Sequence, residues 1–183
     1  MSYISEMNAL KLPYTFDVSV IKSEIAQFTK KDFYDIYNPS VAIETLWSKE
    51  FIVPIGGPHE PVKFFANDSL KKCPYLLSIF ELFECPVETF RIHSLDPGAS
   101  ISPHNDTGFS FEYGKVRLHV PIQTNDNVDI ILEREQIKMR EGECWYCNFD
   151  KLHEVHNRGN QTRVHLIIDC MVNDWLKEVF NCK

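Results

Sequence analysis

Two nine-residue segments, 115–123 and 162–170, alternate between apolar residues on one face and largely polar residues on the other. Such alternation is typical of a β-strand, because successive side chains point to opposite faces of a sheet. The polar faces of the two segments carry four basic residues, Arg117, His119, Arg163 and His165. In a simple two-layer sandwich these side chains would lie in solvent, whereas a barrel that encloses a ligand would gather them inside. The pattern therefore favours a closed β structure with a polar interior.

Further strands and turns fill the region from residue 87 to residue 170. Strands are predicted at 87–95, 115–123, 143–149, 152–156 and 162–170, with a hairpin at 128–139. Short strands at regular spacing are typical of sandwiches and barrels of the jelly-roll and cupin kind. Helices are predicted at 17–30, 69–84 and 173–181, and an apolar run at 51–55 has the length of a strand. We therefore expect a mainly β fold with flanking α-helices.

The length of 183 residues favours one domain. In this interpretation residues 1–86 form an N-terminal support of helix and strand. Residues 87–170 form the β core, and residues 171–183 form a C-terminal helix.

Composition excludes several classes of protein. The formal net charge of −7 argues against a non-specific nucleic-acid binder, which needs a basic face. The sequence has no apolar run near the ~18 residues that span a bilayer, and its start lacks the basic and apolar regions of a signal peptide. We therefore expect a cytoplasmic protein whose six cysteines are reduced. The pair Cys144 and Cys147 lies on a predicted strand, where residues three apart point to opposite faces, so we interpret both cysteines as structural.

The segment 103–107 carries a histidine and an aspartate with the spacing of metal ligands. On an extended chain His104 and Asp106 project to the same side, because they are two residues apart. One imidazole and one carboxylate make up two of the three ligands of the 2-His-1-carboxylate triad, which binds Fe(II) and leaves other positions open. The third ligand has to come from a distant strand, and His153, which opens a predicted strand, is the natural candidate.

His156 competes with His153 for this role. The two are three residues apart, so on a strand they point to opposite faces and cannot easily bind one ion together. Arg163 lies ten residues after His153, beyond a turn. An arginine at this place suits the far carboxylate of a dicarboxylate co-substrate, because its planar guanidinium can bind a carboxylate through two parallel hydrogen bonds. This favours His153 as the third ligand.

In their order and spacing these motifs resemble the aspartyl/asparaginyl β-hydroxylase family, including its bacterial free-proline hydroxylases. The motifs are His104-x-Asp106, Arg117-Leu118-His119-Val120-Pro121, Met139-Arg140-Glu141-Gly142-Glu143-Cys144-Trp145, His153-Glu154-Val155-x-Asn157 and Arg163-Val164-His165-Leu166-Ile167-Ile168-Asp169. The resemblance covers roughly residues 87–175. It implies a double-stranded β-helix and an Fe(II)- and 2-oxoglutarate-dependent dioxygenase.

The resemblance also implies a role for each motif. His104, Asp106 and His153 would hold Fe(II). Arg163 would pair with the C5 carboxylate of 2-oxoglutarate, and His119 would assist it. Arg117 would hold either the co-substrate or the carboxylate of the substrate. Hydroxylation would be coupled to the conversion of 2-oxoglutarate and O₂ into succinate and CO₂.

Two features bear on the substrate. Animal, peptide-modifying members of the family lack the carboxylate ligand, whereas the bacterial free-amino-acid hydroxylases keep it, as Asp106 does here. Once Arg163 is paired with the co-substrate, Arg117 and Arg91 would remain on the inward face without a partner. A buried arginine without a partner is costly. We therefore expect these two arginines to bind the carboxylate of a free amino acid or a related small carboxylate.

Two alternatives stay open. The enzyme could hydroxylate an Asp, Asn or Pro side chain within a peptide or protein, or the chain could be a cupin-like metal- or ligand-binding module without turnover. Iron-dependent release of succinate separates the enzymes from the module. A pocket closed by residues 40–60 and 107–113 favours a free amino acid, and an open groove favours a peptide.

Overall fold

Two antiparallel sheets form the body of the protein in a computed structural model that describes residues 7–28, 34–35, 41–44, 66 and 68–181. The seven-stranded sheet has the order β1-β9-β6-β11-β4-β3-β2, and the four-stranded sheet has the order β5-β10-β7-β8. The larger sheet consists of β1 (Ala9–Thr15), β2 (Tyr34–Asp35), β3 (Val41–Glu44), β4 (Val87–Leu95), β6 (Lys115–Gln123), β9 (Glu143–Cys147) and β11 (Arg163–Met171). The smaller consists of β5 (Ser100–His104), β7 (Val128–Leu132), β8 (Glu135–Ile137) and β10 (His153–Asn157).

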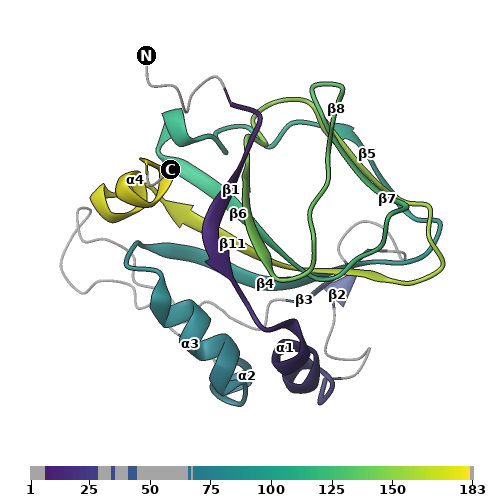
Figure 1. Cartoon of the computed structure of the whole chain (residues 1–183), viewed down its shortest axis with the longest axis horizontal. Helices are drawn as coiled ribbons and strands as arrows, with labels where there is room; N and C mark the ends of the chain where they lie inside the picture. Colours follow the sequence, from purple (N-terminus) through teal and green to yellow (C-terminus); the bar gives the residue numbers. More distant parts are fainter. Residues whose placement is uncertain (1–6, 29–33, 36–40, 45–65, 67, 182–183) are drawn as a thin grey trace.

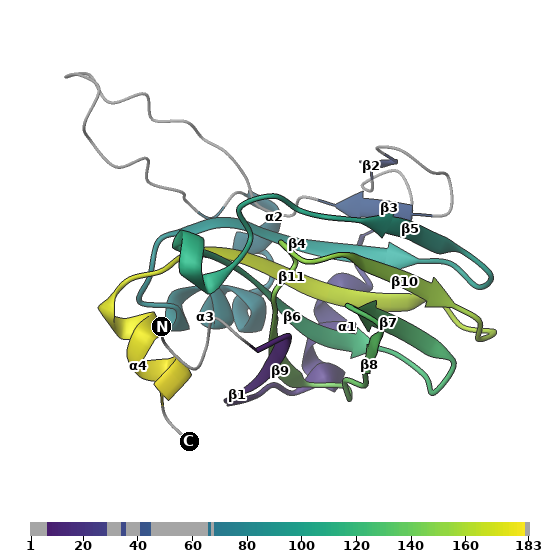
Figure 2. The same cartoon turned by 90° about the horizontal axis from the view of Figure 1, so that it is seen from above.

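Helices cover one face of the larger sheet, and the smaller sheet covers the other (Figure 1). The helices are α1 (Val18–Ile25), α2 (Asp68–Lys71), α3 (Pro74–Leu82) and α4 (Asp174–Asn181), with a short 3₁₀ helix at Phe111–Tyr113. Seen from above, the long strands β4, β6 and β11 run along the length of the molecule, and α4 lies near one end of it (Figure 2). The larger sheet is therefore the central layer between helices and the second sheet.

The alternation along β6 and β11 corresponds to these two sides. Their apolar faces are buried in the core shared with the helices, which includes Val116, Leu118, Val120, Ile122, Leu166 and Ile168. Their polar faces point between the sheets, where a second apolar cluster surrounds Ile130, Phe149 and Val155. The predicted mainly β, jelly-roll fold is confirmed.

The helix predicted at 69–84 is divided in two. Proline has no backbone N–H and is tolerated only in the first turn of a helix. Pro74 accordingly opens α3, while α2 ends three residues earlier at Lys71. The helix predicted at 17–30 begins as expected, with the side chain of Asp17 accepting from the backbone N–H of Ser19 at 2.9 Å, but it ends at Ile25.

Strand β1 lies in a region that the sequence left as mixed. It pairs with β9 at the edge of the larger sheet, where Pro13 is tolerated because an edge strand needs hydrogen bonds on one side only. Strands β2 and β3 also join this sheet, so the sheet extends beyond the core expected at 87–170. The apolar run at 51–55 lies outside the described residues.

The two cysteines of β9 lie in different cores. Cys144 packs on the helix side and Cys147 packs between the sheets, and burial raises the pKa of the Cys144 thiol to about 12. Two thiols on opposite faces of a strand cannot form a redox or zinc pair.

Among the described residues, no helix has the length and apolar character needed to cross a membrane.

Candidate active site

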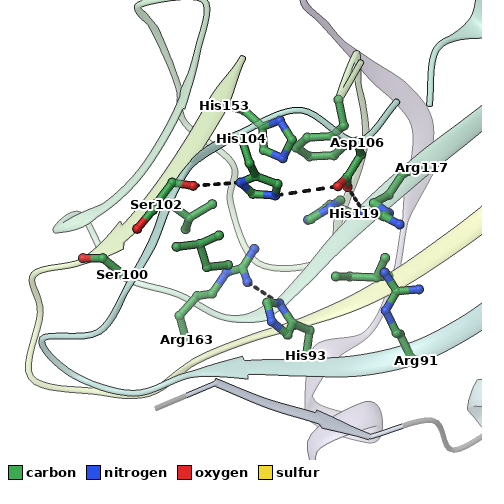
Figure 3. A pocket seen from close by; sticks show the side chains of 14 residues that line it. Arg91, His93, Ser100, Ser102, His104, Asp106, Arg117, His119, His153 and Arg163 are labelled. Carbon is green, nitrogen blue, oxygen red and sulfur yellow. Dashed lines mark hydrogen bonds and ion pairs between the residues drawn. The ribbon is translucent and has the colours of Figure 1, made fainter. Parts of the chain in front are cut away.

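A cavity of about 480 Å³ opens between the two sheets. Its lining includes every residue that the sequence assigned to the site, together with further polar and apolar side chains from both sheets (Figure 3). The lining residues are Arg91, His93, Ser100, Ile101, Ser102, His104, Asp106, Arg117, His119, Phe149, His153, Val155, Arg163 and Ile167. A cavity of this size is typical of a site for small molecules.

Three lining residues, His104, Asp106 and His153, form what we call the ligand cluster. One ligand atom of each lies within 4.8 Å of the others. His104 ends β5 and His153 opens β10, and the two are directly paired in the antiparallel register of these strands. Asp106 follows in the loop, with its Oδ1 3.7 Å from Nε2 of His104. The structure therefore brings together the three side chains that the sequence singled out as metal ligands.

The backbone fixes the tautomer of both histidines in the ligand cluster. Nδ1 of His104 lies 2.8 Å from the carbonyl oxygen of Ser102, and Nδ1 of His153 lies 2.9 Å from that of Lys151. A carbonyl oxygen only accepts, so each Nδ1 carries the proton and each Nε2 is left with a free lone pair. Burial also lowers the pKa of His153. In the neutral form that a metal requires, both imidazoles therefore offer Nε2 as the ligand atom.

His156 takes no part in this cluster. Its Nδ1 lies 2.9 Å from the Ser100 hydroxyl, and its Nε2 lies 2.9 Å from the carboxylate of Glu154. Both ring nitrogens are thus occupied away from the ligand cluster.

Two segments that carry the cluster are tied together by Phe149 and Asp150. The Asp106 N–H donates to the Phe149 carbonyl at 2.9 Å, and the Asp150 N–H donates to the Phe109 carbonyl at 3.1 Å. The Asp150 side chain accepts from the Gly108 N–H at 2.7 Å. These bonds hold the loop after β5 against the segment before β10, so the position of Asp106 is set by backbone. The sequence alone gives no signal for Asp150, because its contacts depend on this loop pairing.

A second group, the arginine–histidine cluster, consists of Arg163, His93, His119 and His165 on the larger sheet. Arg163 is only 1% exposed, and its guanidinium donates to Nδ1 of His93 at 3.1 Å and to Nδ1 of His165 at 2.8 Å. Burial lowers the pKa of Arg163 to about 9. Among the described residues no carboxylate pairs with it, and its Nε–H is buried without a partner. A buried cation in this state calls for an anionic partner.

The three histidines around Arg163 are neutral. Burial first, and then the charge of Arg163, hold the pKa values of His93, His119 and His165 well below their usual range. Nε2 of His119 and of His165 are buried without a hydrogen-bond partner, and His119 also lines the cavity. Arg163 therefore stays the only charge of this cluster.

Asp169 overturns one premise of the sequence analysis. Arg117 and Arg91 were expected to lack partners, but both pair with this carboxylate, Arg117 at 2.7 Å and Arg91 at 2.9 Å. Asp169 lies on the same face of β11 as Arg163, two positions beyond Ile167, and adds a negative charge to the inward face. The period-two pattern of β11 was the signal that could have identified it.

The residues present fit a mononuclear iron site with a dicarboxylate co-substrate. Two neutral imidazoles and one carboxylate are the donor set that non-haem Fe(II) takes while keeping positions open. In the same cavity, buried Arg163 offers an Nε–H without a partner and an uncompensated positive charge to an anion.

Comparison with known proteins places this site in a family. The family model described as Aspartyl/Asparaginyl beta-hydroxylase matches residues 15–172. No match was found among curated protein sequences.

Three solved structures share the fold. A 2OG-Fe(II) oxygenase family oxidoreductase from Burkholderia pseudomallei is 12% identical, with a TM-score of 0.61 over 92% of this chain and 86% of that one. The viral collagen prolyl hydroxylase of Paramecium Bursaria Chlorella virus-1 is 10% identical, with a TM-score of 0.57 over 94% and 100% of the two chains. A Pseudomonas putida prolyl-4-hydroxylase is 12% identical, with a TM-score of 0.54 over 93% and 95%. With the family match over most of its length, the chain belongs to the aspartyl/asparaginyl β-hydroxylase family and is a 2-oxoglutarate-dependent Fe(II) oxygenase.

Proposed function

We propose that the chain acts as one dioxygenase domain that hydroxylates a free amino acid or a related small carboxylate, with His104, Asp106 and His153 as the ligands of Fe(II). One observation carries the proposal: three ligand atoms within 4.8 Å of one another share a cavity with a buried arginine that has no carboxylate partner among the described residues. Bound iron would, with 2-oxoglutarate and O₂ as co-substrates, supply the chemistry that converts a C–H bond into C–OH, with succinate and CO₂ as the co-products. The residues of the chain would bind and orient the co-substrate and the substrate, and would exclude water from the site.

Arg163 is our candidate for the far carboxylate of 2-oxoglutarate. Its bonds to His93 and His165 fix the plane of the guanidinium, and its remaining N–H groups stay available for a carboxylate. His119, which lines the same cavity and lies against Phe149, would form the wall beside this carboxylate. A rigid fork in a buried site binds a planar anion with little loss of side-chain entropy.

The charges around the cavity favour a substrate that carries a carboxylate. Three arginines, Arg91, Arg117 and Arg163, face two carboxylates, Asp106 and Asp169, so one positive charge is in excess. Fe(II) and the 2-oxoglutarate dianion cancel each other, and the excess remains. Arg91 donates through Nη1 alone to its partners among the described residues, Thr89 and Asp169, so the rest of its guanidinium suits the substrate carboxylate.

An anaerobic preparation with Fe(II) and 2-oxoglutarate, exposed to O₂ with each of the twenty amino acids, tests the proposal. We expect succinate and a product that has gained one oxygen atom to appear together with one amino acid, and neither to form with the His153→Ala variant. If succinate is released only in the presence of short peptides containing Asp, Asn or Pro, the substrate would be a peptide or protein rather than a free amino acid. A protein that binds metal but releases no succinate in either case would be a binding module.

A further inference from the structure

Asp169 is a buried carboxylate that touches no ligand of the proposed iron site, yet it is joined to one of them through a single arginine. We propose that Asp169 is a positioning residue, which acts through Arg117 to orient Asp106 and to leave one oxygen of that carboxylate for the metal. This inference rests on the proposed function, because it takes Asp106 as an iron ligand.

Asp169 fixes the plane of the Arg117 guanidinium. It is 2% exposed and accepts from Nε of Arg117 at 2.7 Å and from Nη2 at 3.1 Å, which is a two-point contact along one edge of the guanidinium. Nη1 of Arg91 and the hydroxyl of Thr89 donate to Asp169 Oδ2 at 2.9 and 2.7 Å. Burial alone would raise the pKa of Asp169, but the bonds and charges of the two arginines outweigh it and lower the pKa to about 2. Asp169 is therefore ionised, and it accepts four hydrogen bonds, two of which hold the Arg117 guanidinium in place.

The free end of the guanidinium reaches the ligand cluster. Nη1 of Arg117 donates to Oδ2 of Asp106, whereas Oδ1 of Asp106 lies toward Nε2 of His104. One face of the guanidinium is covered by the ring of Phe109, whose centroid is 4.2 Å from Cζ. The two oxygens of Asp106 are thus distinguished: Oδ2 is occupied by Arg117, and Oδ1 is the one that faces the histidines.

Charge gives Asp169 a second effect on Asp106. The side chains of Arg117 and Arg91 are mostly buried, and both pair with Asp169, whose negative charge offsets the repulsion between the two guanidinium groups. Without Asp169, Asp106 would become the main counter-ion of Arg117. A carboxylate that has to neutralise a buried arginine is a poorer ligand for a cation.

Cobalt(II) in place of iron tests this in the absence of co-substrate and O₂. We expect Asp169→Asn to weaken Co(II) binding about tenfold, within the range seen when groups that support metal ligands are removed. We also expect it to change the visible absorption spectrum of bound Co(II), which reports on the ligand geometry and which a purely structural role would not change. Thr89→Val is the matched control: it removes one bond to the same carboxylate but leaves both arginines paired, so its Co(II) affinity and spectrum should match those of the wild type.

A double-mutant cycle tests the path through Arg117. If Asp169 acts through this arginine, then adding Asp169→Asn to an Arg117→Met variant should cause no further loss of Co(II) affinity. Should Asp169→Asn fail to fold, Arg117→Lys replaces it, because a single ammonium cannot hold both carboxylates, and the same loss and spectral change are expected. Wild-type affinity and spectrum in a folded Asp169→Asn or Arg117→Lys protein, or additive losses in the cycle, would overturn the inference. Absence of Co(II) binding in the wild type would instead overturn the proposed iron site.

Discussion

The two clusters that face each other across the cavity are completed in different ways. In the ligand cluster, backbone carbonyls fix both histidines and backbone hydrogen bonds fix the loop of Asp106, so the arrangement is set without any ligand. The arginine–histidine cluster holds a buried cation among neutral rings, with no carboxylate partner among the described residues and with orphaned polar atoms. The ligand cluster is already arranged to bind a cation. The arginine–histidine cluster carries an unpaired positive charge, which a bound anion would neutralise. We therefore expect metal and co-substrate to change the free energy of unfolding by different amounts.

The largest effect is expected in the ligand cluster. His153→Ala should abolish measurable Co(II) binding, because the variant loses one of the two neutral imidazoles, and it should leave the far-UV circular dichroism spectrum unchanged. His156→Ala removes a histidine three residues away whose ring nitrogens are bonded elsewhere, and its affinity should equal that of the wild type. Loss of binding in the His156 variant alone would show that the ligand cluster is misassigned.

Acid should destabilise the arginine–histidine cluster next. Buried His93, His119 and His165 have lowered pKa values in the folded protein, so they stay neutral while the unfolded chain takes up protons below about pH 6.5. Stability is then complete above this pH and falls as pH drops below it, by up to about 4 kcal/mol per pH unit for three such groups. Urea unfolding of the metal-free protein between pH 7.5 and 5 measures the slope. A flat profile would mean that these rings take up protons in the folded protein over the same pH range as in the unfolded chain.

Arg163 should show opposite effects on affinity and on stability. Arg163→Lys keeps the charge but loses the planar guanidinium with its two parallel N–H donors. The affinity for 2-oxoglutarate should therefore fall by about 1–3 kcal/mol in titrations of the metal-loaded protein. Arg163→Met removes the uncompensated buried charge and should raise the free energy of unfolding of the ligand-free protein by about 1–3 kcal/mol. Unchanged 2-oxoglutarate affinity in the lysine variant would move the anion site to Arg117 or Arg91.

The smallest effect is expected at the hydrogen bonds between the two segments that carry the ligand cluster. Asp150→Ala removes the bond to the Gly108 N–H, worth about 1.5–3 kcal/mol for a charged acceptor, and should weaken Co(II) binding a few-fold without changing 2-oxoglutarate affinity. Asp126→Ala, at an exposed turn, is the control and should change neither affinity. Equal losses for metal and co-substrate would mean that Asp150 supports the whole barrel rather than the ligand cluster.

Much of the fold could be predicted from the sequence, because a strand with one buried apolar face shows apolar residues at every second position. Strands β4 and β6 have the predicted bounds, 87–95 and 115–123, since one face of each meets the helices and the other meets the cavity. Strand β1 could not be predicted, because an edge strand with a proline follows no strong pattern. The break between α2 and α3 needed the position of Pro74 within the turn, which periodicity does not give.

The site could be predicted from the sequence where the spacing of two residues determines the side to which their side chains project. The spacing of two residues predicted that His104 and Asp106 share a side, and the structure brings them together although β5 ends at His104 and Asp106 lies in the loop beyond it. The pairing of Asp169 with Arg117 joins two strands, and only the β6–β11 register makes these residues direct neighbours. Cross-strand partners of this kind depend on register, which one sequence does not specify.

Within the part of the chain that the structure describes, strand β5 lies at the edge of the smaller sheet and pairs there with β10 alone. Because His104 on β5 and His153 on β10 are directly paired, an ion bound by both side chains would cross-link the edge strand to its neighbour. Loading the protein with metal should therefore slow amide hydrogen exchange most along β5 and little in β6 or β11, which lie inside the larger sheet. Bound metal would then stabilise the end of β5 against local opening, and its loss would free the strand that carries His104.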